Sequence, residues 1–164
     1  MGVAGCGKSV AGAELSARLG LPLVEGDDFH PPGNIAKMRE GTPLTDADRA
    51  EWLQRLGEEL KALPAGAVLT CSALKRGYRD RLRAAVPALH FLHLSLSPHQ
   101  ALERVAARTD HFYPPSLVAS QFEALEDPSG EPRVLVVDAT QHVQRLVDDA
   151  ARWVAGASAA FNNA

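Results

Sequence analysis

Eight residues near the start of the chain have the types and the spacing of a phosphate-binding loop. They match the pattern G-x-x-x-x-G-K-[ST] at every fixed position, and in order they are Gly2, Val3, Ala4, Gly5, Cys6, Gly7, Lys8 and Ser9. In such a loop, successive backbone N–H groups converge on an anion, and glycines leave room for it and allow positive φ angles. Lys8 is then placed to reach the β- and γ-phosphates of a nucleotide, and the Ser9 hydroxyl is placed to bind Mg²⁺.

The alternative for this motif is a glycine-rich turn before an ordinary helix. A helical pattern begins at about Lys8, so the positive N-terminal end of a helix would point at the same anion. This favours a nucleotide-binding loop, in which we expect Lys8 also to act in catalysis.

Asp27 is the candidate for a carboxylate that acts on an acceptor hydroxyl. Phosphoryl transfer needs positioning and charge neutralisation, with a carboxylate to orient or deprotonate the attacking group. Asp27 follows a predicted strand, at the edge of the sheet where α/β proteins place their ligands. Acidic residues after a glycine also cap turns, and from the residues alone the two interpretations are even.

Arg104 and Arg108 lie one helical turn apart, and hence on one face, at the entry to a polar and aromatic stretch over 109–114. A loop that closes over a nucleotide, with arginines at its hinge, would exclude water and neutralise transition-state charge. We therefore expect a lid at about 105–118, with Arg104 binding the nucleotide and Arg108 acting in catalysis. Helix-surface ion pairs with Glu103 or Glu123 are the alternative.

The spacing of apolar residues predicts the elements that position these groups. Short apolar runs alternate with longer helical patterns, which is typical of an α/β fold with helices on both faces of a parallel sheet. The expected strands are 21–24, 67–71, 90–95 and 133–137, and the expected helices are about 8–19, 45–63, 78–85, 98–108, 115–125 and 142–155. Thr45 and Asp48 are expected to cap the second helix, and the segment 25–45 is expected to be a loop.

A phosphate loop normally extends from the C-terminal end of a buried strand, but here only Met1 precedes Gly2. We therefore expect the sheet to lack a first strand beside its active centre. The apolar burial of a whole strand would be absent, which predicts a domain of low stability.

Length and composition restrict the classes of partner. The 164 residues, with 46% hydrophobic content, predict one domain over 1–156, and the last residues, 157–164, lack periodicity and are expected to be a disordered tail. A net charge of −3 argues against nucleic acid, and the longest apolar runs are far below the ~20 residues of a membrane helix. Two cysteines without metal-binding spacing fit a reducing, cytoplasmic setting.

Four further motifs follow the phosphate loop in order. They are G-D-x-x-H-P from Gly26, K-M-x-x-G-x-P-L from Lys37, D-R-x-x-W-L from Asp48 and C-S-A-L-K from Cys71, with Ser120-Gln121-Phe122 later in the chain. With these motifs, the chain resembles the gluconate kinase (gluconokinase) family from Gly2 to about Asp138. The resemblance implies a P-loop kinase fold of three α/β/α layers with a lid. It also implies that ATP phosphorylates D-gluconate to 6-phospho-D-gluconate.

A sugar acid carries a carboxylate and many hydroxyls, so its pocket is expected to contain arginine, whose planar guanidinium binds a carboxylate with two hydrogen bonds. Taken singly, each basic residue is more often a solvated surface charge. The resemblance raises Arg49, Lys75 and Arg79 to substrate-binding candidates. His30 is expected to contact substrate with Asp27, although it could instead brace its own loop.

Two alternatives remain open at this stage. The acceptor could be another small acid such as shikimate, or the chain could bind a nucleotide without activity because the absent strand distorts the phosphate loop. Members of the resembled family are commonly dimers, which leaves a homodimer open. No membrane partner is expected.

Overall fold

The chain forms two pairs of parallel strands. The structure is a computed structural model that describes residues 1–107 and 114–161. In one pair β1 (Leu23–Glu25) lies beside β2 (Val68–Thr70), and in the other β3 (Phe91–Ser95) lies beside β4 (Val134–Asp138). The four strands expected from the apolar runs are confirmed, with slightly shifted bounds. The register places Leu23 opposite Val68 and Phe91 opposite Val134.

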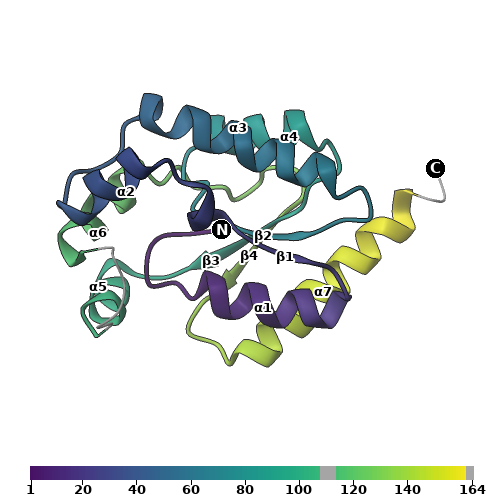
Figure 1. Ribbon diagram of the computed structural model, residues 1–164. Coiled ribbons are helices and arrows are strands. Elements are labelled where there is room, and N and C mark those ends of the chain that lie inside the picture. Colours follow the sequence, from purple (N-terminus) through teal and green to yellow (C-terminus); the bar gives the residue numbers. More distant parts are fainter. Residues whose placement is uncertain (108–113, 162–164) are drawn as a thin grey trace.

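Helices cover the strands in layers (Figure 1). The longer helices are α1 (Lys8–Leu19), α3 (Asp46–Ala62), α4 (Arg76–Ala85) and α7 (Val143–Phe161), and the shorter ones are η1 (Gly26–Phe29), α2 (Pro32–Arg39), α5 (Pro98–Ala106), η2 (Pro115–Leu117) and α6 (Val118–Ala124). Helix α3 packs on α4 at one face of the strands, and α1 packs on α7 at the other. Helices α2, α5 and α6 gather at one end of the molecule. This arrangement is the expected α/β fold with three layers.

Local sequence signals set several helix ends. The Thr45 hydroxyl accepts a hydrogen bond from the Asp48 backbone N–H at 3.2 Å, and the Asp48 carboxylate accepts one from the Thr45 N–H at 2.9 Å. This is the predicted capping box of α3. Helix α1 ends at Gly20, whose φ of 65° lies in the left-handed region that suits glycine.

Two segments differ from the sequence expectation. The segment 25–45, expected to be a loop, contains η1 and α2, and α2 begins with Pro32 in its first turn, where proline is well suited. Helix α7 continues past the expected end near Ala155 to Phe161, because the residues after Gly156 are rich in alanine, the strongest helix former. Residues 162–164 lie outside the described part of the chain.

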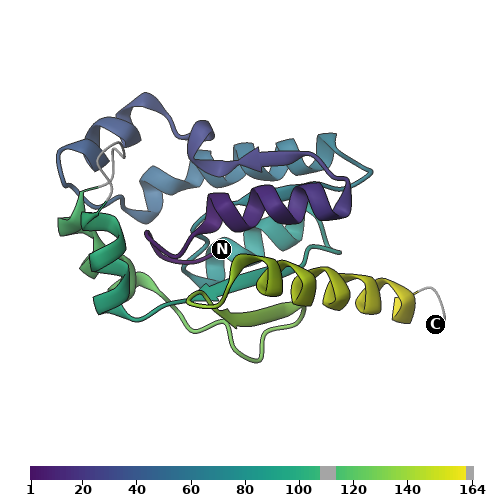
Figure 2. The same cartoon turned by 90° about the horizontal axis from the view of Figure 1, so that it is seen from below.

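The first two residues connect the two strand pairs. The Met1 amino group donates to Leu92 O at 2.6 Å, the Met1 carbonyl accepts from Leu94 N at 3.0 Å, and Gly2 N donates to Ser72 O at 3.2 Å. Figure 2 shows the N-terminus among the strands and not at an outer edge. Among the described residues, α1 is the first helix or strand of the chain.

Beyond Met1, the space between the strand pairs is an apolar groove of about 950 Å³. Residues of β2, β3 and the inner side of α1 line it, among them Leu15, Leu69 and Leu92. In the described part of the chain, β2 pairs only with β1 and β3 only with β4. The facing edge of β3 bonds to Met1, and the groove lies along the edges of both strands.

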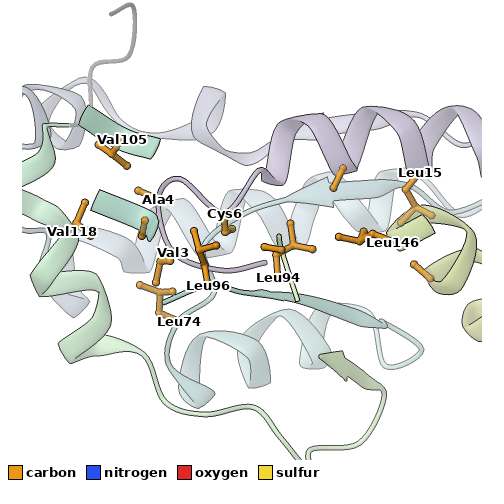
Figure 3. Close-up of a cluster of buried hydrophobic side chains, with 14 of the residues drawn as sticks. Val3, Ala4, Cys6, Leu15, Leu74, Leu94, Leu96, Val105, Val118 and Leu146 are labelled. Carbon is orange, nitrogen blue, oxygen red and sulfur yellow. The ribbon is translucent and has the colours of Figure 1, made fainter. Parts of the chain in front are cut away.

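Apolar side chains of the phosphate loop pack into the main hydrophobic cluster (Figure 3). Val3 and Cys6 are each 2% exposed, and they pack with Leu94 and Leu96 of the β3 segment. The loop is therefore anchored in the core through its apolar side chains. None of the described helices is both long and apolar enough to cross a membrane.

Candidate active site

The phosphate loop leads directly into α1, with Gly7 at the N-cap and Lys8 as the first helical residue. Gly5 has a φ of 82°, and a Cβ there would lie 2.9 Å from the Ala101 carbonyl oxygen. Any other residue would therefore be strained and would also collide with α5. Lys8 Nζ donates to the carbonyls of Gly2 at 3.2 Å and Val3 at 3.1 Å, so the ammonium group lies over the loop.

One cavity brings together most of the site residues expected from the sequence. Its lining contains Lys8, Ser9, Asp27, His30 and Arg49, together with small residues of the phosphate loop, Ala4, Gly5 and Gly7. These residues come from α1, from η1 and the residue that follows it, and from α3. The apolar part of the lining is Met38, Leu44, Val105 and Leu117. The cavity therefore joins a phosphate-binding loop to a carboxylate and a cation, as transfer of a phosphoryl group to an anionic acceptor requires.

Ser9 also lies close to an acidic side chain that the sequence analysis did not single out. The Ser9 hydroxyl donates to Glu25 Oε2 at 3.3 Å, and the Thr70 hydroxyl donates to the same oxygen at 2.5 Å. A hydroxyl beside a carboxylate is the oxygen-donor type that Mg²⁺ prefers, and Mg²⁺ commonly takes only one or two protein ligands beside phosphate oxygens and water. The residues present therefore fit Mg²⁺. The described residues contain no group of three or more His, Cys, Asp or Glu side chains that could hold a metal ion. Phosphate oxygens and water would therefore have to supply the other ligands.

His30 is held in a fixed orientation at the cavity wall. Its ring stacks on Trp52, and the Trp52 Nε1–H donates to Gly26 O at 2.7 Å. Asn34 Nδ2 lies 3.4 Å from His30 Nδ1 and donates to Asp48 O at 2.8 Å. Burial, opposed by Asp27 and helped by a smaller effect of Arg49, lowers the pKa of His30 to about 4. The imidazole is therefore neutral near pH 7 and can both donate and accept hydrogen bonds.

A second, more open cavity adjoins the first and shares Arg49 with it. Lys75 Nζ donates to Asp46 Oδ1 at 2.6 Å, and the Tyr78 hydroxyl donates to the same oxygen. These two hydrogen bonds lower the pKa of Asp46. The Arg49 guanidinium lies 5.9 Å from the centroid of the Tyr78 ring. Lys75 thus lies near Arg49, but its charge is already paired.

Comparison with known proteins gives the family. No protein-family model matches the chain. A gluconokinase from Gluconobacter oxydans is 44% identical over 156 residues, which cover 93% of this chain and 87% of the relative. The chain belongs to the gluconokinase family. The crystal structure of a gluconokinase from Sinorhizobium meliloti 1021 is similar with a TM-score of 0.90 and 45% identity, over 99% of this chain and 93% of that one.

A more distant neighbour supports the fold of this gluconokinase-family chain. The APS kinase of Mycobacterium tuberculosis has a TM-score of 0.66 at 15% identity, over 93% of this chain and 92% of that one. At that identity the likeness concerns the fold alone. The fold expected from the sequence, a P-loop kinase fold, is confirmed.

Arg79 does not lie in the cavity, in contrast to the expectation that it binds substrate. Its side chain is fully buried, and its guanidinium donates to the Glu131 carboxylate at 2.5 to 3.2 Å. The remaining donors reach the carbonyls of Ala73, Leu74 and Glu126. Every N–H of the guanidinium has a protein acceptor, so Arg79 joins α4 to the segments around it and has no donor left for a ligand.

The arginines expected near the lid are only partly described. Arg104 Nη1 reaches Gly5 O at 3.5 Å, and both terminal nitrogens donate to Ala139 O at 3.2 Å. It therefore contacts the phosphate loop from α5, and a contact with nucleotide stays a prediction. Arg108 and the rest of the segment 108–113, in the middle of the expected lid, lie outside the described residues.

Three polar residues near the site, Glu25, Asn34 and Gln121, were given no role from the sequence. Glu25 ends β1, and its position at the carboxyl end of a strand was the available signal. Asn34 lies in a segment that was expected to be a loop, and Gln121 lies in a short helix whose packing partner could not be inferred. Asn34 and Gln121 are 5% and 7% exposed, and the burial of a polar side chain becomes visible only in the folded structure.

Proposed function

We propose that this protein transfers the γ-phosphoryl group of ATP to a hydroxyl of D-gluconate, which gives ADP and 6-phospho-D-gluconate. The observation that carries the proposal is the single cavity lined by Lys8, Asp27 and Arg49 in a chain of the gluconokinase family. The identity of the substrate is inferred from the relatives, which are named gluconokinases. The cavity contains groups that can bind both ATP and a sugar acid.

At the nucleotide end, the loop backbone over 2–8 and the start of α1 bind the phosphates. Lys8, held over the loop by the Gly2 and Val3 carbonyls, binds the β- and γ-phosphates, and the charge of its ammonium group stabilises the extra negative charge of the transition state. Ser9, with Glu25 beside it, would hold Mg²⁺. When bound, Mg²⁺ supplies charge neutralisation at the phosphate oxygens.

At the acceptor end, Asp27 orients the attacking hydroxyl and takes its proton. The hydroxyl oxygen forms a bond to the γ-phosphorus while the bond from that phosphorus to the β–γ bridging oxygen breaks, and ADP leaves with the bond electrons. The proton from the hydroxyl passes to the Asp27 carboxylate. His30 lines the same cavity in a fixed orientation and a neutral form, and it hydrogen-bonds to other hydroxyls of the acceptor.

The acceptor carboxylate is bound by Arg49. Among the described residues its guanidinium has no ion pair and no hydrogen bond, and it lies over the Tyr78 ring at the junction of the two cavities. Lys75 is paired with Asp46, so it contributes positive charge from a second position. An unpaired guanidinium can bind a carboxylate with two parallel hydrogen bonds.

Arg104 and Arg108 contribute to nucleotide binding and catalysis, and residues 105–118 form a lid on a single domain over 1–156. We also infer a cytoplasmic protein, which fits two free, buried cysteines, and a homodimer, which the mass measured by light scattering would test.

An assay of ADP release across a panel of small acids tests the function. We expect turnover with D-gluconate and Mg·ATP, and little or none with shikimate or other aldonates. Turnover on shikimate without turnover on gluconate would replace the substrate. Binding of ATP without transfer to any acceptor would leave only a nucleotide-binding module.

A further inference from the structure

Gln121 makes a contact with the phosphate loop that the proposed mechanism does not yet use. It lies on α6, is 7% exposed and lines the same cavity as Lys8 and Asp27. Its Oε1 accepts a hydrogen bond from the Ala4 backbone N–H at 2.5 Å. Because an N–H can only donate, the oxygen of the amide must face Ala4, which fixes the orientation of the side chain.

The peptide group that Gln121 contacts also holds the catalytic lysine. The Ala4 N–H belongs to the peptide between Val3 and Ala4, and the carbonyl of that peptide, Val3 O, accepts from Lys8 Nζ at 3.1 Å. A trans peptide is planar, so its N–H and C=O point in opposite directions. A hydrogen bond that fixes the N–H therefore also fixes the direction of the carbonyl that receives the ammonium group.

The peptide between Gly5 and Cys6, two peptides further along the loop, is contacted from the other helix at this end of the molecule. Arg104 of α5 lies 3.5 Å from the Gly5 carbonyl, and the Ala101 carbonyl of α5 limits Gly5 to a residue without Cβ. Helices α5 and α6 pack against each other. The turn over 3–5 is therefore held between two helices, and Gln121 supplies the only contact among the described residues to the Ala4 N–H.

We propose that Gln121 is a positioning residue for phosphoryl transfer: it orients the peptide between Val3 and Ala4, and through that peptide it sets the position of Lys8. Without the Gln121 acceptor the peptide can rotate, and Lys8 loses a partner that keeps it above the loop. The chemical step depends on the placement of this charge, so the effect falls on kcat. This inference rests on the roles proposed above for Lys8 and the loop.

Three substitutions at position 121 separate positioning from simple packing. Gln121→Met keeps the length and shape of the side chain but removes the acceptor. Gln121→Glu keeps an acceptor at the same reach and adds a negative charge, which repels ATP. Gln121→Asn keeps the amide but shortens the reach by one methylene.

We expect Gln121→Met and Gln121→Asn to lower kcat about tenfold or more, because both lose the bond to Ala4. We expect Gln121→Glu to keep kcat within about threefold of the parent while KM for ATP rises. In addition, the Ala4 amide proton should move upfield in the NMR spectrum of the Met variant and stay downfield in the Glu variant. Because Asn and Glu are both polar, the result does not depend on the Met variant folding.

Two controls make the outcome unambiguous. Leu82→Val, in the core on α4, should lower Tm without lowering kcat, which shows that lost stability alone does not slow the reaction. Lys8→Ala should abolish transfer. A parent-like kcat in Gln121→Asn would overturn the Gln121 inference, whereas an active Lys8→Ala variant would overturn the proposed function of the loop.

Discussion

The imidazole of His30 stacks on the indole of Trp52, with ring centroids 4.4 Å apart and an interplanar angle of 11°. Trp52 lies on α3 and is completely buried in a hydrophobic cluster. The stack therefore anchors His30, which lines the cavity, to this cluster. Burial keeps the imidazole neutral, with its pKa lowered to about 4. The same contact thus sets the position and the charge of a residue that we assign to the acceptor.

This lowered pKa makes stability depend on pH. As pH falls below about 6.5, the unfolded chain binds a proton at His30 before the folded protein does, so stability present above pH 6.5 is lost progressively down to about pH 4. In His30→Gln, the free energy of unfolding should fall less steeply with falling pH, with a slope smaller by at most about 1.4 kcal/mol per pH unit. Urea unfolding of both proteins at several pH values between 7 and 4 measures it. Identical slopes would show that His30 titrates normally in the folded state. His93, whose pKa burial also lowers to about 4, is present in both proteins.

Asp27→Asn should lower kcat by about 10²- to 10⁴-fold, the usual contribution of a positioned acid or base. The affinity for ATP should stay nearly constant, because Asp27 serves the acceptor and not the phosphates. Steady-state kinetics with an independent ATP-binding titration checks both. Asp28→Asn, next in the chain and outside the cavity lining, is the matched control and should behave as the parent. Full activity in the Asp27→Asn enzyme would remove Asp27 from this role.

Arg49 and Arg79 should respond in opposite ways to removal of their charge. Arg49→Met should raise KM for gluconate about ten- to a hundredfold, as expected for a lost charge-assisted hydrogen bond worth ~1.5–3 kcal/mol, with little loss of stability. Arg79→Met should destabilise the fold by about 3–5 kcal/mol, because it removes the fully buried partner of the Glu131 carboxylate, leaves that carboxylate with Arg83 alone, and removes the donor to three backbone carbonyls.

Gluconate kinetics and urea unfolding of both variants make this comparison, with Arg81→Met, exposed on the same helix as Arg79, as the control. A raised KM for gluconate in a stable Arg79→Met protein would restore Arg79 to the substrate-binding set.

Because an apolar groove separates β2 from β3, we expect that a strand added before Met1 stabilises the fold. An apolar extended segment of four or five residues fused before Met1 should pair with both facing edges, and each large side chain that it buries contributes about 1.5–3 kcal/mol. It would also convert the Met1 amino group, whose pKa burial lowers, into an uncharged peptide. A rise in Tm relative to a Gly/Ser extension of equal length is expected. An equal Tm for the two extensions would mean that the groove does not accept a strand.

Local sequence alone determined the phosphate loop, the capping box at Thr45 and the four parallel strands, because each depends on residue types at fixed short spacing. It also gave Asp27, His30 and Arg49, since motifs carried them. Only the tertiary structure decided that Arg79 is saturated by Glu131 and backbone carbonyls, while Arg49 lines the cavity without an ion pair to any of the described residues. Two arginines have the same chemistry in a sequence, and the partners that separate them come from segments up to 52 residues away. The same reason hid Gln121, whose contact with Ala4 spans 117 residues.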